Sequence, residues 1–343
     1  MRWLLLIALT VLGTLAGDAL GLPSSSLFAG MLAGIALALG WPAGPDPGGA
    51  PAPLLRASEA LVGVVLGTYV QLSTLEEIGS DVVAIGLVTL ATLGLSVACG
   101  LALAHFTELD RATAAFGTIA GGATGVIVMA RELGADQRLV AVLQYLRVVV
   151  VVVLTPLVAA AAFDTGGRGA GGLAAAGGSP VRGLAFAAVC VAVGLVLARR
   201  VPLPAPTLLL PLLVAAVLTV TGAPGVAQVP GLVQQLAFGV IGVEVGLRFT
   251  PASLRSAGRV LAPALALIGA LLIASFGLAL ALAPLADVSV LSAYLATTPG
   301  GLYAVLAVAV DSGADTTFVL AVQVLRLLVM LLAAPALARR LAP

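Results

Sequence analysis

The chain has 343 residues, of which 61% are hydrophobic and 9% charged, with a formal net charge of +1 and a mean hydropathy of +1.19. A soluble domain carries about 25% charged residues, so this composition excludes a water-soluble globule and indicates a multi-spanning membrane protein. The sequence has no basic tail for nucleic acid, and its two cysteines, Cys99 and Cys190, form neither a disulfide framework nor a CxxC motif.

Apolar stretches of about the length of a membrane span follow one another along the chain, since a span needs about 20 apolar residues. The first half contains predicted helices at 3–20, 24–41, 54–72, 81–104 and 138–162. The second half contains predicted helices at 182–198, 206–221, 231–248, 259–283 and 316–338. Two further apolar segments, 110–133 and 288–312, contain Gly-Gly pairs and predict broken helices.

The two halves resemble each other in sequence. Residues 118–156 align without a gap to residues 297–335 at a constant offset of 179, and 14 of the 39 pairs are identical. Gly-Gly, Gly-Ala-Asp, Gln-x-x-Arg and a proline recur in both halves. The segment between the halves has seven glycines in 18 residues, which is typical of a flexible linker. We therefore predict repeat one at 1–162, a linker at 163–180 and repeat two at 181–343.

The placement of arginine indicates how often the chain crosses the membrane, because cytoplasmic loops collect positive charge. We place the N-terminus in the cytoplasm and count the 14 arginines outside the helix interiors. If both broken segments cross, these arginines divide 7 to 7 between the two sides. If both are re-entrant, they divide 12 to 2 in favour of the cytoplasm. We therefore expect an all-α protein of two inverted five-helix repeats, each with a re-entrant Gly-Gly hairpin, and both termini in the cytoplasm.

The Gly-Gly pairs predict a binding site. Irregular backbone within a membrane persists only where protein buries it or where it lines a wet cavity, and a half-helix N-terminus attracts anions. Close helix packing through small residues is the alternative interpretation. Recurrence at one aligned point favours a substrate site between two hairpin tips. The predicted substrate-binding residues at the tips are Gly121, Gly122, Thr124, Gly125, Thr297, Thr298, Gly300, Gly301 and Tyr303, and the Thr118 hydroxyl is expected nearby.

Two arginines lie inside predicted helices. Arg147 and Arg326 each follow a glutamine, Gln144 or Gln323, by three residues. Arginine at this depth costs at least about 2.5 kcal/mol by insertion scales, so each needs a partner or a cavity. The Arg–Gln pairs either bind an anionic substrate or brace the hairpins by capping their carbonyl groups. Glu244 is expected either to pair with these arginines or to serve as a proton-coupling carboxylate.

The patterns GGATG…ELGAD…VAVLQYLRV and PGGLYAV…DSGAD…LAVQVLRL, with LPSSSLFAGMLAGIALAL near the start, resemble the AbrB-type duplicated bacterial membrane proteins over nearly the whole chain. Ala120 stands where that family usually has proline, so the first hairpin tip is expected to differ in shape. The hairpins are also similar to those of citrate-type and other elevator transporters. These resemblances imply a multi-pass protein of the bacterial cytoplasmic membrane and a homodimer.

We expect a secondary active, elevator-like transporter that holds a small organic anion near the membrane midplane, with H⁺ or Na⁺ as the coupling ion and no cofactor or metal. The family also carries the labels ammonia monooxygenase and regulator. A monooxygenase needs a metal or flavin site, and one histidine with two separated cysteines supplies no clustered ligands, so we expect no enzyme activity. A membrane-embedded enzyme, a passive channel and a regulatory membrane protein are the alternatives.

Overall fold

The computed structural model describes residues 2–40, 49–70, 82–119, 126, 130, 134–163, 179–201, 205–223 and 226–341. Within these ranges the chain forms helices and no strands. The first half contains α1 (Arg2–Ala19), α2 (Ser25–Gly40), α3 (Ala52–Thr68), α5 (Val82–Phe106), α6 (Arg111–Thr118) and α8 (Gln137–Ala162). The second half contains α10 (Pro180–Ala198), α11 (Pro206–Val220), α12 (Gly231–Leu247), α13 (Pro251–Ala257), η2 (Gly258–Val260), α14 (Leu261–Leu285), α15 (Val290–Thr297), α16 (Leu302–Ser312) and α17 (Thr316–Leu341).

Local sequence accounts for several helix ends. Pro180 and Pro206 open α10 and α11, where a missing backbone N–H costs nothing because the first turn has no internal acceptor for it. Gly21 follows α1 with a φ of +68°, a left-handed conformation that glycine adopts without steric strain. Long apolar runs between such signals form the helices.

The predicted all-helical class is confirmed, and each of the ten predicted helices has a counterpart among the described elements. Five described helical segments are long and apolar enough to cross a membrane: α1, α5, α8, α10 and the stretch Gly258–Leu285. The short helix α13 lies where a loop was expected, between α12 and α14. The broken segment 288–312 forms α15 and α16, separated by the non-helical residues 298–301. In segment 110–133, Gly121, Gly122, Thr124 and Gly125 lie outside the described residues.

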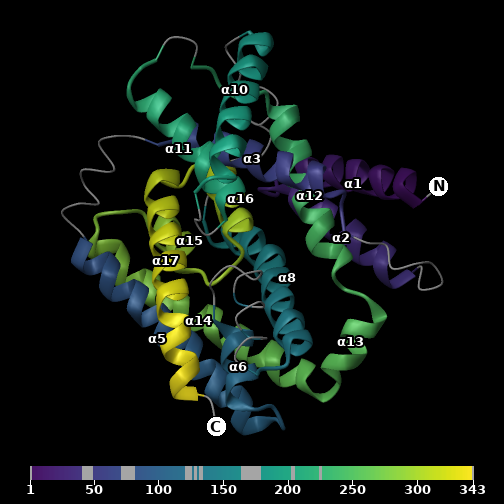
Figure 1. Ribbon diagram of the computed structural model, residues 1–343, viewed down its shortest axis with the longest axis vertical. Coiled ribbons are helices and arrows are strands. Elements are labelled where there is room, and N and C mark those ends of the chain that lie inside the picture. The colour runs from purple at the N-terminus through teal and green to yellow at the C-terminus, as the bar shows by residue number, and fades with distance from the viewer. Residues whose placement is uncertain are drawn as a thin grey trace.

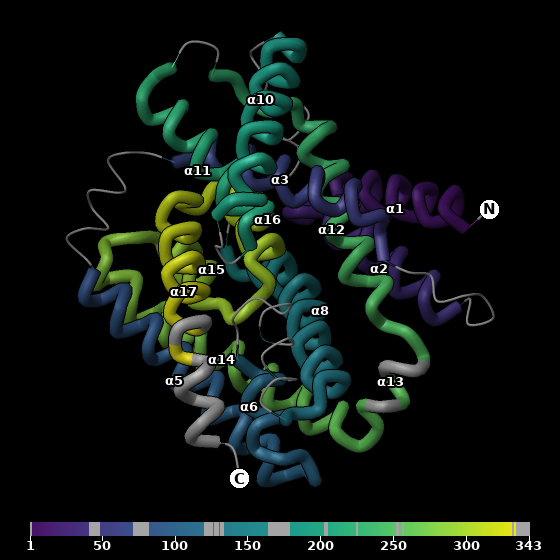
Figure 2. The backbone as a smooth tube through the Cα atoms, in the orientation of Figure 1, coloured from purple at the N-terminus to yellow at the C-terminus, as the bar shows by residue number. Residues whose placement is uncertain are grey.

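The described helices form two groups (Figure 1). We call α1, α2, α3, α10, α11 and α12 the outer group, because they pack mainly against one another. The hairpin group consists of α5, α6, α8, α14, α15, α16 and α17, in which α6 packs on α5 and α8, and α15 packs on α14 and α17. Figure 2 shows the chain entering the outer group first and the hairpin group second in each half. Corresponding elements of the two halves therefore occupy the same group.

Glycine allows the helices of the outer group to cross at backbone contact. A Cβ on Gly242 of α12 would overlap the carbonyl oxygen of Leu27 on α2, and one on Gly246 would overlap that of Met31. Gly63 of α3 has the same relation to Leu208 of α11. Small residues permit such close approach between membrane helices, where dispersion contacts replace the hydrophobic effect. Each crossing joins a helix of one half to a helix of the other.

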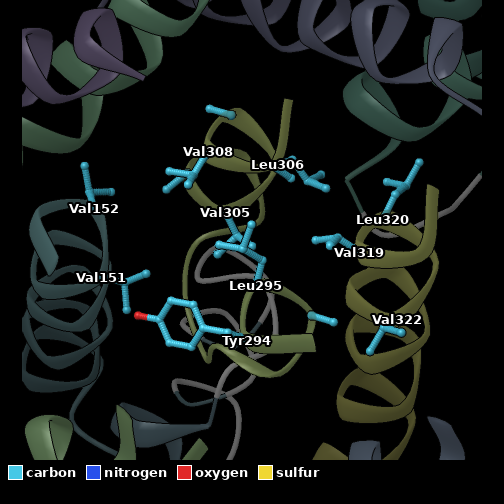
Figure 3. Close-up of a cluster of buried hydrophobic side chains, with 14 of the residues drawn as sticks. Val151, Val152, Tyr294, Leu295, Val305, Leu306, Val308, Val319, Leu320 and Val322 are labelled. Atoms are coloured by element: carbon cyan, nitrogen blue, oxygen red, sulfur yellow. The ribbon is translucent and has the colours of Figure 1, made fainter. Parts of the chain in front are cut away.

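An apolar cluster fills the space between α8, α15, α16 and α17 in the hairpin group (Figure 3). Val151 of α8 and Val319 of α17 are fully buried on two sides of it. Tyr294 of α15 and Val305 of α16 lie between them (Figure 3). The two short helices therefore pack against the long helices that carry Arg147 and Arg326.

Candidate functional site

Arg326 and Gln323 of α17 hold the carbonyl end of α15. The Arg326 Nη1 group donates to Thr298 O at 2.8 Å, and its Nη2 group donates to Gln323 Oε1. Gln323 Nε2 in turn donates to Leu295 O at 2.8 Å. The last carbonyl groups of a helix have no internal partner and carry the negative end of its dipole. The buried Arg326 guanidinium and the adjacent Gln323 amide donate hydrogen bonds to these carbonyl groups, and the positive charge offsets the negative end of the dipole.

Arg147 and Gln144 of α8 make the same contacts with α6. Arg147 donates through Nη1 to Thr118 O at 2.9 Å and through Nη2 to Gln144 Oε1 at 2.8 Å. Gln144 Nε2 donates to Phe116 O at 2.6 Å and to Ile119 O at 2.8 Å. We call these two Arg–Gln pairs the braces. Their contacts are those of the capping interpretation, in which each arginine secures a hairpin helix through its carbonyl groups.

The braces leave the Nε donor of each arginine unused. Arg147 and Arg326 are 3% and 4% exposed, and the Nε group of each is buried without a hydrogen-bond partner. Among the described residues, neither guanidinium forms a salt bridge with a carboxylate. The two arginines interact electrostatically with each other. Two buried positive charges with free N–H groups are therefore available to an anion.

The predicted site threonines use their hydroxyl protons on the backbone. Thr297 Oγ1 donates to Ala293 O at 2.9 Å and to Ser275 O at 3.1 Å. Thr118 does the same with Ala114 O at 3.2 Å and Ser96 O at 2.9 Å, and Thr298 Oγ1 donates to Tyr294 O at 2.6 Å. These hydroxyls fasten α6 to α5 and α15 to α14, and only their lone pairs stay available to a ligand.

The two ends of each broken segment meet. Asp136 N, at the start of α8, donates to Thr113 Oγ1 in α6 at 2.9 Å. In the other half, Asp315 N donates to Ser292 Oγ in α15, also at 2.9 Å. Both residues of each bond are related by the sequence offset of 179. Residues near the two ends of each broken segment are therefore in direct contact.

The repeated Gly-Ala-Asp motif makes the turn that closes each segment. Gly134 and Gly313 have φ of +80° and +74°, which glycine tolerates and other residues adopt at a cost. Asp136 then caps α8 by accepting from Arg138 N at 2.8 Å, and Asp315 accepts from Phe318 N at 2.9 Å. This motif recurs in the sequence, but no role was predicted for it; glycine followed two residues later by an N-cap residue was the available signal.

The second hairpin tip contacts both helix groups. A Cβ on Gly300 would overlap Val151 of α8, so the turn lies directly on the helix that carries Arg147. Tyr303, in the first turn of α16, bonds through its hydroxyl to Glu59 of α3, which also accepts from Thr207 Oγ1 of α11. Gly301 is the N-cap residue of α16. Glu59 was absent from the predicted site, although an acid within the apolar sequence of α3 was a signal for it.

Glu244 lies apart from the braces. Its carboxylate accepts from both Nε and Nη2 of Arg248, one turn further along α12, and from Ala50 N at 2.7 Å. The predicted ion pair between Glu244 and the intramembrane arginines is therefore wrong: Arg248 is nearer in the fold, because an i,i+4 spacing places both side chains on one helix face. Arg248 also lies 5.7 Å above the ring of Tyr145 on α8.

A cavity of about 10 Å³ adjoins the first brace, between Arg147, Thr118, Cys99 and Leu271. It has room for about one water molecule and is too small for an organic anion in this conformation. Within the described residues, no three His, Cys, Asp or Glu side chains gather in a metal-binding cluster.

These features define an all-helical, multi-pass membrane protein with duplicated Arg–Gln braces. Residues 43–342 match a family model described as "Transition state regulatory protein AbrB". The chain is 32% identical over 343 residues to "Putative regulator AbrB" of Escherichia coli (strain K12), covering 99% of this chain and 96% of that protein. It is 26% identical over 304 residues to "Uncharacterized protein YhjN" of Bacillus subtilis (strain 168), covering 85% of this chain and 79% of that protein. The chain belongs to the AbrB family.

Proposed function

We propose that this protein is a secondary active transporter of a small organic anion in the bacterial cytoplasmic membrane. Two inverted repeats carry one re-entrant hairpin each, and the hairpin group moves against the outer group in an elevator-like manner. The substrate binds near the membrane midplane, between the hairpin tips. The protein acts as a homodimer, as elevator transporters commonly do, and has no enzyme activity.

The hydrogen bonds that join the ends of each broken segment support re-entrance. A segment that crossed the hydrocarbon core would have its ends about 30 Å apart. Thr113 and Asp136 lie within hydrogen-bond distance instead, at 2.9 Å, as do Ser292 and Asp315. Because each repeat then crosses an odd number of times, the second hairpin enters from the side opposite to the first. The arginine count of 12 inside to 2 outside agrees with this topology.

The braces are the observation that carries the proposed anion site. Arg147 and Arg326 bring two buried positive charges together without a described carboxylate partner. The N-terminal turn of α16, which begins directly after Gly301, presents N–H groups without internal acceptors and the positive end of the helix dipole. The free Nε groups of the two arginines offer further hydrogen-bond donors to an anion, and its charge offsets the mutual repulsion of the arginines.

Transport in reconstituted vesicles tests this function. We expect purified protein in proteoliposomes to accumulate one of a panel of labelled mono- and dicarboxylates against its gradient. Downhill flux alone would indicate a channel, and tightly bound metal or flavin in the purified protein would favour an enzyme. If Arg147→Ala and Arg326→Ala both transported with unchanged KM, the anion site between the braces would be wrong. Arg255→Ala, at an exposed position on α13, is the matched control.

Cysteine labelling in intact cells tests the re-entrant topology. In a background without Cys99 and Cys190, single cysteines replace the exposed residues Arg111 and Gln137, which lie near the two ends of the first broken segment. We expect both to be protected from a membrane-impermeant thiol reagent, whereas cysteines at the exposed positions Asp287 and Gly313 both react. If one cysteine of a pair reacted and the other did not, the segment between them would cross the membrane. Light scattering of the purified protein in detergent reports whether the protein is a dimer.

A further inference from the structure

An acid within the apolar sequence of α3 touches the second hairpin. Glu59 lies about 10 Å along this helix from Ala52, at about 1.5 Å per residue. Thr207 of α11 donates through Oγ1 to Glu59 Oε2 at 2.5 Å, and the Tyr303 hydroxyl of α16 bonds to the same carboxylate. Since α16 also packs on α3, Glu59 is a direct contact between the outer group and the hairpin group.

The helix crossing next to Glu59 does not require an acid. Gly63 of α3 and Gly242 of α12 each lie against the backbone of a crossing helix, and the offset of 179 relates them. The residue four positions before Gly63 is Glu59, whereas the residue four positions before Gly242 is Phe238, which is buried in the apolar core. The carboxylate therefore serves something other than packing, and acids within membrane helices mark ion and proton pathways.

The described residues supply no cation to the Glu59 carboxylate. It forms no salt bridge with them, and the Thr207 and Tyr303 hydroxyls that bond to it are neutral. α11 carries no ionisable residue. The other ionisable residues on or next to α3 and on the helices packed against it are Arg56 and Tyr69 by α3, Arg182 and Cys190 on α10, Glu244 on α12 and Asp311 on α16. Metal cations need more oxygen ligands than one carboxylate and two hydroxyls, so the proton is the cation that suits this site.

The charge of Glu59 opposes an anion at the proposed substrate site. Tyr303 lies in the first turn of α16, whose free N–H groups belong to that site. An anion at this turn and an ionised Glu59 repel each other strongly, because the dielectric away from water is low. The Tyr303 hydroxyl has a single proton to donate, and Glu59 accepts it. Neutralising Glu59 removes the repulsion and leaves this hydroxyl free.

We propose that Glu59 is a proton site linked to the anion site. Glu59 takes up one proton as the anion binds and becomes a neutral carboxylic acid, and the Tyr303 hydroxyl then donates to the anion instead. When the anion leaves, Glu59 releases the proton and the bond between Tyr303 and Glu59 forms again. Proton and anion therefore bind together. This linkage rests on the proposed transport function, whereas protonation of Glu59 itself does not.

Infrared difference spectroscopy of the purified full-length protein in detergent tests the proton site, with H⁺ alone as the probe. A step from about pH 8 to about pH 4 covers the range in which most glutamates in proteins titrate. We expect a C=O band of a protonated carboxyl group that Glu59→Gln lacks. We also expect a change in a tyrosine C–O band that both Glu59→Gln and Tyr303→Phe lack. Glu108→Gln, at an exposed acid between α5 and α6, is the matched control and keeps the tyrosine change. The wild-type tyrosine change in Glu59→Gln would overturn the proposal.

The pH dependence of anion exchange in proteoliposomes tests the linkage. The pH is equal on both sides, and the panel of labelled mono- and dicarboxylates is the probe. While Glu59 titrates, we expect KM to fall about tenfold for each unit by which the pH is lowered, because one proton is linked to each anion. Glu59→Gln should keep the low KM at every pH, since its amide is neutral and of similar shape. Glu108→Gln should behave as wild type, and protonation of the carboxylate itself affects all variants alike.

The KM of Glu59→Gln decides the proposal. The wild-type pH dependence in this variant would show that another group binds the proton. A folded Glu59→Gln that exchanges no anion at any pH would also contradict the proposal, because the neutral amide should replace the protonated acid. Tyr303→Phe gives a second measurement: its KM should rise severalfold at low pH, where the wild-type hydroxyl is free for the anion.

Failure of the proposed function is distinguishable from failure of the proton site. If no anion is transported but the carboxyl and tyrosine signals disappear together in Glu59→Gln, the proton site remains and the transporter is rejected. If an anion accumulates and Glu59→Gln changes neither the infrared signals nor the pH dependence of KM, the proton site alone is rejected.

Discussion

Glycine has different roles in the α2–α12 crossing and in the α15–α16 break. In the crossing, Gly242 and Gly246 remain inside a regular helix and let its backbone touch the carbonyl groups of α2. In the break, Gly300 and Gly301 lie outside any helix, and the freed carbonyl groups bind Arg326 and Gln323. A glycine pair in a membrane sequence therefore does not by itself indicate a broken helix. A broken helix is distinguished by a buried hydrogen-bond donor that binds its exposed backbone groups, because unsatisfied polar groups are costly away from water.

The largest effect is expected from removing a brace. Arg326→Met keeps much of the side-chain volume but leaves the Thr298 carbonyl and the Gln323 side chain without their donor. We expect a loss of about 3 kcal/mol in unfolding free energy, since each buried unsatisfied group costs about 1–3 kcal/mol. Denaturant unfolding in detergent measures it, with the exposed residue Arg255→Met as control. Arg147→Met should cost the same amount, and a loss confined to one arginine would break the equivalence of the two braces.

A smaller effect is expected at the crossing. Gly242→Ala places a methyl group against the Leu27 carbonyl, so α2 and α12 must move apart. We expect a loss of about 2 kcal/mol, within the range for overpacked interiors. Gly94→Ala, within α5, is the matched control, because a Cβ at Gly94 would meet no atom within 4 Å. The control should be neutral or up to about 1 kcal/mol more stable, from the higher helix propensity of alanine. Equal melting of both variants would remove the distinction between packed and exposed glycines.

The smallest effect is expected at the turn that follows the first broken segment. Gly134→Ala meets no atom within 4 Å but must adopt a φ of +80°. The expected loss is about 1 kcal/mol, from the strain of a left-handed alanine. Gly277→Ala, within α14 and equally free of neighbours, is the control without a positive φ. A variant as stable as this control would show that the turn relaxes to another conformation.

The sequence predicted more of the helices than of the contacts between them. Apolar length located the described helices, and the Gly-Gly pair of the second half marked the break between α15 and α16. The Gln-x-x-Arg spacing marked both braces without identifying their partners, since buried arginine and glutamine must bind something. The partner predicted for Glu244 was wrong, and Glu59 was missed, because the fold brings residues together across helix groups that spacing along one helix does not relate.

The sequence by itself determined that this is a membrane protein, where its helices lie and which motifs are duplicated. Hydropathy, glycine and proline act within a few residues of the chain. Only the tertiary structure decided which carbonyl groups Arg147 and Arg326 bind, and that Asp311 accepts from Ser24 N. Such contacts depend on how helices from the two halves cross. Dispersion packing and the satisfaction of buried polar groups set those crossings, and both are properties of surfaces that no single segment contains.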